Sequence, residues 1–169
     1  MQKKWFWLAV FASVATMPAM STPSNSQRAM LERLVQCDST AIEVVDFNNL
    51  LDSKKIVLPR DDKNAGWGGV AWKVDPPITI GTVKSNVVVM ADRRSFYLFI
   101  ESPNPRTDSG QVVQTLKLHD GTPNDQYFDY RREDGERTVR VVSTENAAAN
   151  YNVGCFYDQE SVRRVQHRK

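Results

Sequence analysis

Short segments rich in β-branched and aromatic residues recur along most of this chain, and they limit its possible folds more than any other feature. The clearest are 85–91 and 95–100, which are separated only by Asp92-Arg93-Arg94. Two apolar runs joined by so short a turn predict a tight antiparallel hairpin. A second hairpin is predicted over 127–132 and 137–142, because Asp-Gly stands in the turn between them.

The other apolar segments are equally short. They predict further strands at 41–47, 55–59, 69–74, 78–80, 112–118 and 150–157. About nine short strands with turn residues every ~8–12 positions are typical of an antiparallel β-sandwich, so the predicted fold class is all-β. Apolar residues recur at helical spacing over 26–36, which predicts one short N-terminal helix.

Residues 1–21 are predicted to be a secretory signal peptide. A positively charged Met-Gln-Lys-Lys start precedes an apolar run over 5–17, and Pro18 and the small residues of Ala19-Met20-Ser21 follow. The apolar run is well short of the ~20 residues that a membrane-spanning helix needs. We therefore expect a protein that is exported to the bacterial periplasm and has no membrane span of its own.

The remaining chain is expected to form a single domain. Residues 22–160 contain no repeat and no linker, and we expect the basic tail over 161–169 to be loose. The full chain has 22 basic and 20 acidic residues, and Lys3 and Lys4 leave with the signal peptide. The mature chain therefore has no net charge that would favour nucleic acid as a partner. Acidic residues also interrupt the arginines and aromatic residues of the hairpin at 127–142.

Cys37 and Cys155 are the only cysteines. In an oxidising compartment an even number of cysteines indicates a disulfide, which here would tie the start of the domain to its end. The alternative is a pair of metal-binding thiolates, which needs further ligands. The only histidines, His119 and His167, do not stand at a metal-binding spacing. We expect the disulfide and no bound metal.

The sequence has no motif that indicates catalysis or a cofactor. GxSxG, GxxxxGK[ST] and GxGxxG are all absent. His119 falls in a predicted turn and His167 in the basic tail, while the neighbouring carboxylates Asp61-Asp62 and Glu133-Asp134 also fall in turns. Such turn residues are normally solvated. We therefore expect a protein that is not an enzyme and binds no cofactor.

Residues 84–102 resemble the N-terminal domain of the CagX/TrbG family of type IV secretion proteins. In that family a Lys-[Ser/Thr]-Asn run enters a strand, turns at Thr-Asp-Arg-Arg and returns as [Ser/Thr]-[Tyr/Phe]-x-Leu. Lys84-Ser85-Asn86, Asp92-Arg93-Arg94 and Ser95-Phe96-Tyr97-Leu98 stand at the same spacing in this chain. Weaker similarities lie in 56–59 together with 71–74, and in 151–157.

The resemblance implies a β-sandwich with a structural, non-catalytic role in a type IV secretion or conjugation channel. The implied partners are sibling copies and other channel subunits, in a homo-oligomer or a hetero-oligomeric ring that meets the outer membrane only through partners. Residues 103–149 have no counterpart in the family, so we expect an insertion with its own hairpin. The family's usual C-terminal domain also has no counterpart here, so binding to a lipoprotein is not carried over.

The resemblance also suggests a use for the turn at 92–94. Family members assemble into rings, which makes Asp92, Arg93 and Arg94 candidates for ion pairs between subunits. The simpler alternative is that Asp92 begins the turn by accepting a backbone hydrogen bond, while both arginines are solvated.

The alternative function is a stand-alone periplasmic inhibitor or immunity protein that blocks a toxin or hydrolase. Small disulfide-linked β proteins act in this way by inserting one loop into a cleft. The loops at 66–69 and 133–136 are the candidates in this chain. Its short length favours this alternative, whereas the segment at 84–102 favours the secretion channel.

Overall fold

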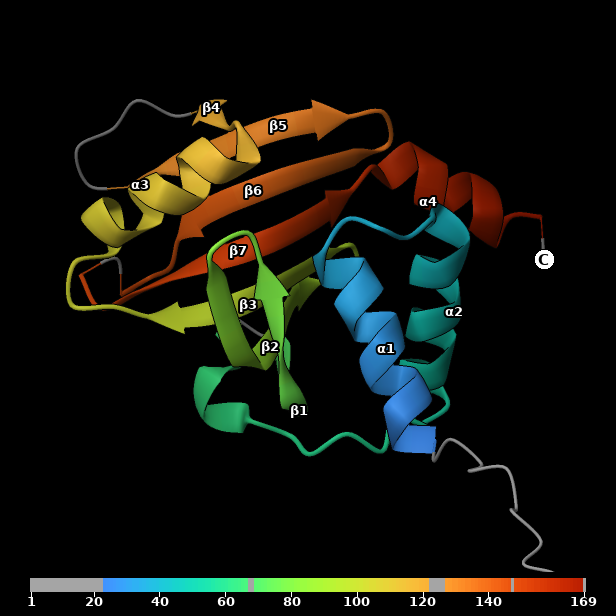
Figure 1. Cartoon of the computed structure of the whole chain (residues 1–169). Helices are drawn as coiled ribbons and strands as arrows, with labels where there is room; N and C mark the ends of the chain where they lie inside the picture. The colour runs from blue at the N-terminus through green and yellow to red at the C-terminus, as the bar shows by residue number, and fades with distance from the viewer. Residues whose placement is uncertain (1–22, 67–68, 122–126, 147, 169) are drawn as a thin grey trace, which may run out of the picture.

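A computed structural model describes residues 23–66, 69–121, 127–146 and 148–168. The predicted signal peptide lies outside these residues. In the described part of the chain, four α-helices accompany one antiparallel sheet (Figure 1). The helices are α1 (Pro23–Val35), α2 (Ala41–Asp52), α3 (Pro105–Leu116) and α4 (Gln159–Gln166), and a short 3-10 helix is η1 (Asp62–Asn64).

The sheet has seven strands in the order β1-β2-β3-β7-β6-β5-β4, and all neighbours are antiparallel. The strands are β1 (Val70–Ile80), β2 (Val83–Asp92), β3 (Ser95–Glu101), β4 (His119–Asp120), β5 (Asp129–Asp134), β6 (Arg137–Ser143) and β7 (Asn150–Tyr157). β7 lies between β3 and β6, so it joins the two predicted hairpins into one sheet. The antiparallel β prediction is confirmed in outline. The described residues form one sheet with helices, however, so the fold is not purely all-β and the sandwich is not confirmed.

The segment predicted as an insertion supplies a large part of this sheet. Residues 103–149 contain α3, β4, β5 and β6. The β5–β6 hairpin confirms the expected hairpin within this segment, and β6 pairs with β7 along its whole length. The segment is therefore structurally continuous with the strands that carry the family resemblance.

The predicted strand at 41–47 is wrong, because these residues belong to α2. Thr40 and Glu43 form a capping box in which the Thr40 amide donates to Glu43 Oε2 at 3.3 Å. Such a Thr-x-x-Glu pair favours a helix start. The buried positions of α2 then recur at helical spacing, at Ala41, Val44, Val45, Phe47 and Asn48. The β-branched composition had obscured this period.

The predicted strand at 112–118 is also wrong, since most of it belongs to α3. Pro105 begins the helix, where a proline has no hydrogen bond to lose. Val112 is fully buried, and Val113 and Leu116 pack against the core beside it. The period of these residues is helical, not alternating.

Two further predictions at the ends of elements need correction. The tail from Ser161 is not loose where it is described, because Asp158 accepts a hydrogen bond from the Ser161 amide at 2.8 Å and starts α4. Residues 55–59 are not a strand. Only the end of this segment pairs with the edge of β1, where the Lys73 amide donates to the Pro59 carbonyl at 2.8 Å.

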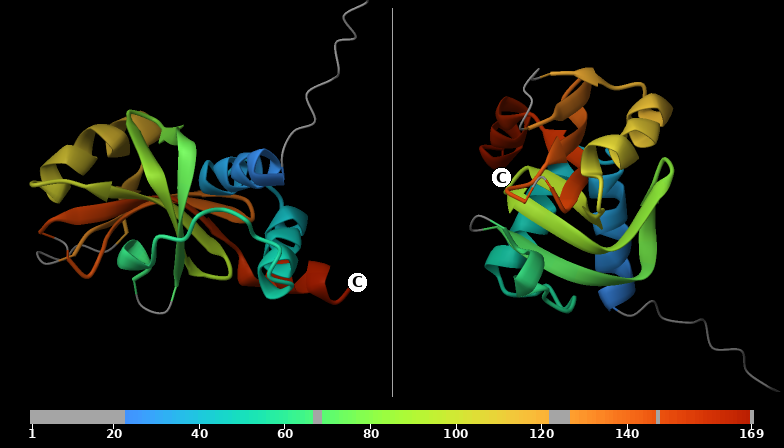
Figure 2. Two further views of the ribbon diagram at one scale, coloured as in Figure 1. Left: turned by 90° about the horizontal axis from the view of Figure 1, so that it is seen from below. Right: turned by 90° about the vertical axis from the view of Figure 1, so that its left-hand side faces the viewer.

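Helices α1, α2 and α3 bury side chains against one face of the sheet, and α4 packs against α2. In the left view of Figure 2, α1 and α3 lie on one side of the strands and η1 lies on the other. Phe47 of α2 packs edge-on against Trp72 of β1 and Phe96 of β3, with ring centroids 5.4 and 5.5 Å apart. The predicted disulfide is confirmed beside this core, between Cys37 after α1 and Cys155 of β7.

Candidate functional site

The strands of the sheet present two different faces. Because side chains alternate along a strand, Phe96 and Leu98 of β3 point to the helices, while Tyr97 and Phe99 point away. We call the second side the helix-free face, because no α-helix covers it and only the short η1 lies on that side. Strand β3 carries Tyr97 and Phe99 on this face, although no α-helix of the described chain contributes to the small apolar cluster there.

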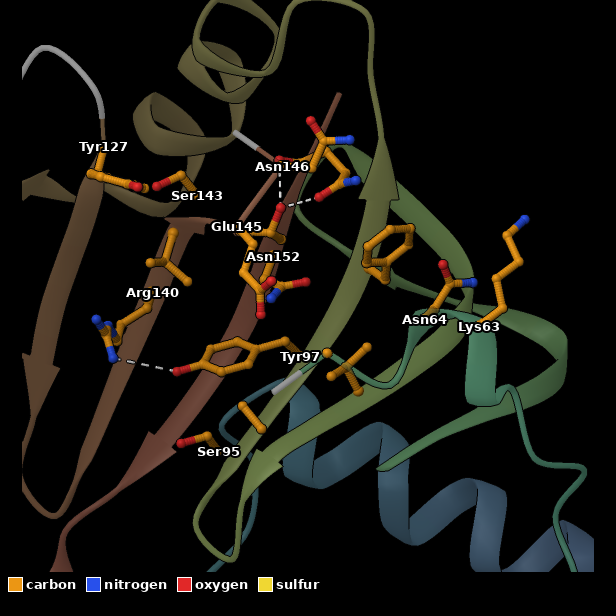
Figure 3. A pocket seen from close by; sticks show the side chains of 17 residues that line it. Lys63, Asn64, Ser95, Tyr97, Tyr127, Arg140, Ser143, Glu145, Asn146 and Asn152 are labelled. Atoms are coloured by element: carbon orange, nitrogen blue, oxygen red, sulfur yellow. Dashed lines mark hydrogen bonds between the residues drawn. The ribbon is translucent and has the colours of Figure 1, made fainter. Parts of the chain in front are cut away.

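A row of three residues crosses this face. Tyr97 of β3 pairs with Gly154 of β7, which pairs in turn with Arg140 of β6. A Cβ atom at position 154 would lie 2.2 Å from the Phe96 carbonyl oxygen and 3.0 Å from Cδ1 of Tyr97. The glycine therefore leaves the space through which the Tyr97 side chain reaches Arg140. Arg140 Nη1 donates to the Tyr97 hydroxyl at 3.5 Å (Figure 3).

The Arg140 guanidinium is held by a carboxylate of the next strand. Its Nε and Nη2 atoms donate to the two oxygens of Asp129 at 3.0 and 2.7 Å. Burial opposes the charge of Arg140, yet the Asp129 and Tyr97 side chains raise its pKa. Burial likewise raises the pKa of Tyr97, despite the nearby positive charge. Tyr97 is thus a neutral phenol beside the Arg140 guanidinium, whose positive charge Asp129 already balances.

A groove of about 490 Å³ lies over this row. Its floor is formed by side chains of the strands, including Val89, Tyr97, Phe99 and Val142. Its rim comes from the segments around the sheet: Lys63 and Asn64 stand on one side, and the residues after β6 stand on the other (Figure 3). The rim side chains are mainly amides and hydroxyls: Asn64, Ser143, Thr144, Asn146 and Asn150.

The groove continues past Phe99. A second hollow of about 480 Å³ shares Lys63, Asn64 and Phe99 with the first. Phe99 is therefore the ridge between two adjoining hollows on the same face. On the floor of the first, Oδ1 of Asn152 is buried and has no hydrogen-bond partner within the described part of the chain.

The residues predicted at the β2–β3 turn lie outside the groove lining. Asp92 Oδ1 accepts hydrogen bonds from the Arg94 amide at 2.7 Å and from the Ser95 hydroxyl at 2.8 Å. Arg93 pairs with Asp52 at 2.8 Å, and the Arg94 guanidinium lies 4.7 Å from the centroid of the Phe156 ring. Asp92 thus begins the turn as the simpler alternative expected, but the two arginines are not merely solvated, because Arg93 pairs with Asp52 and Arg94 lies over Phe156. Contacts of these residues with another subunit remain a prediction.

The two loops predicted as inhibitory plugs have different outcomes. Residues 67–68 of the first lie outside the described residues. The second, at 133–136, is attached to α4, because Glu136 accepts a backbone hydrogen bond from Asp158 at 2.8 Å and pairs with Arg164 at 2.9 Å. This turn is therefore already engaged by its own chain.

Two other features bear on the possible chemistry. Within the described ranges, no three histidine, cysteine, aspartate or glutamate side chains gather as a metal site would require. The helices that the structure describes include none with the length and apolar content needed to cross a membrane. Neither histidine lines the groove, and His119 lies exposed on β4.

No protein-family model, no curated protein and no solved structure matches this chain.

The groove residues were not identified from sequence, although one signal pointed to them. Residues 95–100 are apolar at nearly every position, whereas a strand with one buried face alternates with polar residues. Tyr97 and Phe99 are the positions that break the alternation. Their positions indicate that both faces of the strand at 95–100 contact apolar groups.

Proposed function

We propose that this chain is an exported binding protein that acts by non-catalytic contact with other molecules of the cell envelope. The observation that carries the proposal is the groove on the helix-free face. Its arginine is paired with Asp129, and most other polar side chains around it are amides and hydroxyls. A mainly apolar hollow with a few placed polar groups is typical of a recognition site.

We assign this binding role to a periplasmic structural component of a type IV secretion or conjugation channel. The resemblance over 84–102 supports the assignment, and this segment forms the β2–β3 hairpin, which supplies part of the groove floor. The disulfide between Cys37 and Cys155 is compatible with an oxidising compartment. The partners would be sibling copies and other channel subunits.

The turn of the β2–β3 hairpin is the proposed assembly contact. The Arg93 side chain is 54% exposed and its partner Asp52 is 62% exposed. An ion pair this exposed contributes only ~0–1 kcal/mol to stability. Arg93 can therefore exchange Asp52 for a carboxylate of a neighbouring subunit at little cost to the fold.

The test is a crosslinked pull-down of the tagged chain from native envelopes, with the captured proteins identified by mass spectrometry. We expect other secretion-channel subunits, and we expect Arg93→Glu to remove them. Arg60→Glu is the matched control, because Arg60 forms a similarly exposed ion pair with Asp62 away from the turn. Capture of a single toxin or hydrolase would instead support the inhibitor, and capture that Arg93→Glu leaves unchanged would exclude the turn as the contact.

A further inference from the structure

Apolar groups lie at the bottom of the groove, and polar groups lie around its opening. Aromatic and β-branched side chains of β2, β3 and β6 form its floor. Amides and hydroxyls of η1, of the segment after β6 and of the adjoining ends of β6 and β7 form most of its rim. Tyr127, which is 50% exposed, adds a further aromatic side chain to the rim beside β5. A matching ligand therefore needs a flat apolar face and a polar circumference.

The charges of the first hollow favour an uncharged ligand, and the second hollow has both lysines and carboxylates in its lining: Lys63, Lys73, Lys84, Asp61 and Glu101. Arg140 already makes two hydrogen bonds with Asp129. Lys63 and Glu145 are both exposed on the rim, and their charges are opposite. A phosphate or carboxylate ligand would have to compete with Asp129 for the arginine, which is unfavourable in a partly buried pair.

The position of the groove also excludes a peptide that binds by adding a strand to the sheet. A peptide that joins a sheet pairs its backbone with a free edge strand. The groove lies over β2, β3, β7 and β6, each of which has a neighbouring strand on both sides. Recognition in this groove must therefore depend on side chains, which suits a ligand with many hydroxyl and amide groups.

We infer that the groove is a saccharide-binding site whose ligand is a short chain of N-acetylated hexosamine units. A pyranose ring has apolar C–H faces that pack on the accessible aromatic side chains of the groove, Phe99 and Tyr127, and its hydroxyls project sideways to reach an amide-rich rim. An acetamido group adds a methyl group for the floor and a donor–acceptor pair that an asparagine amide can match. Because two hollows adjoin at Phe99, the ligand spans more than one ring.

The experiment is a titration of the ¹⁵N-labelled, disulfide-bonded chain without its predicted signal peptide, using the trimer of N-acetylglucosamine as the probe. We expect saturable shifts confined to amides around the groove, with a Kd of about 0.1–1 mM. Tyr127→Ala should weaken binding about fivefold, because it removes an aromatic contact. Asn146→Ala should also weaken it, because it removes an exposed rim amide. Ile42→Ala is the control, since Ile42 is 52% exposed on α2 and lies outside the groove.

Absence of saturable shifts up to about 10 mM probe would overturn the inference. Unchanged affinity in both Tyr127→Ala and Asn146→Ala would also overturn it, as would equal affinity for maltotriose, which lacks acetamido groups. The saccharide inference rests on the proposed function only in treating the groove as a binding surface. The inference and the proposed function can fail separately, because capture of channel subunits through Arg93 does not require the saccharide to bind.

Discussion

The two faces of β3 differ in what covers them. Phe96 and Leu98 are fully buried beneath the helices, and Phe96 packs edge-on against Phe47 and Tyr157. On the opposite face, Phe99 remains partly exposed as the ridge between two hollows. One strand thus supplies both the centre of the core and the centre of the groove.

This difference assigns separate roles to neighbouring residues. Side chains on the helix-covered face gain free energy mainly by leaving water, so they determine stability. On the helix-free face, Phe99 retains exposed area that a ligand can cover, whereas Tyr97 is only 3% exposed. Substitutions on the first face should therefore change unfolding, and those on the second should change binding.

The largest expected effect comes from the disulfide that anchors the helix-covered side. Cys37 and Cys155 are 118 residues apart, and closing so long a loop restricts the unfolded chain. Cys37→Ser and Cys155→Ser should each lower the free energy of unfolding by about 4–5 kcal/mol, because each removes the same bond. Chemical denaturation measures this loss. Two single variants that differ widely, or thiols that titrate in the native protein, would contradict the assignment.

A pair of phenylalanine substitutions tests the two faces directly. Phe96→Ala should cost about 3–5 kcal/mol, because it leaves a cavity in a fully buried core. Phe99→Ala, on the half-buried opposite face of the same strand, should cost about 1–2 kcal/mol but weaken ligand binding. Denaturant unfolding and the saccharide titration give the two readouts. Equal losses of stability would show that the faces are not distinct.

Gly154→Ala should disturb the groove from beneath. The new methyl group would meet the Phe96 carbonyl at 2.2 Å and Tyr97 Cα at 2.7 Å, so β3 or β7 has to shift. We expect a loss of about 1–3 kcal/mol from overpacking. The contact between Tyr97 and Arg140 should also be lost, which crystallography of the variant would show. A variant with unchanged stability and an unmoved Tyr97 would contradict the close approach of β7 to β3 at Gly154.

The smallest expected effect is the loss of one hydroxyl on the helix-covered face. Tyr157 donates to the Leu34 carbonyl at 2.9 Å, so Tyr157→Phe should cost about 1 kcal/mol near neutral pH. Burial raises the pKa of Tyr157, so the native state keeps this proton when the unfolded state has lost it. Stability from this group is therefore present below about pH 10 and declines above it. Denaturation across alkaline pH should show a shallower decline in Tyr157→Phe, and an identical decline would contradict this assignment.

The features that local sequence determines were predictable. The turn at 92–94 follows directly from two flanking apolar runs, and Asp92 begins it as an acceptor of the Arg94 amide. The Asp-Gly turn gave the β5–β6 hairpin, and an even cysteine pair gave the disulfide. Each depends on a few neighbouring residues or on a single covalent rule.

The helices were harder to predict because their β-branched composition favours strands, whereas the spacing of their buried residues is helical. Residues 41–47 contain the β-branched residues Ile42, Val44 and Val45, which favour strands. The capping pair of Thr40 and Glu43 and the burial of one side of the segment outweigh that preference. The same conflict misassigned 112–118, where two adjacent valines suggested a strand.

The groove required the strand order, which local sequence does not contain. Tyr97 and Arg140 are 43 residues apart, and they meet only because β7 enters between β3 and β6 and carries a glycine at the crossing. Asp129 joins them from β5. Sequence alone indicated excess apolar character on β3, but not which residues would surround it.

The central claim is that the groove on the helix-free face of this protein is a binding surface. The most direct test places a photo-crosslinking amino acid at Tyr127 on the groove rim or at Ile42 on α2, in chains expressed in native envelopes. The two positions are almost equally accessible, at 50% and 52% exposure. We predict crosslinked products from position 127 well in excess of those from position 42. Equal yields, or a higher yield from position 42, would contradict the claim.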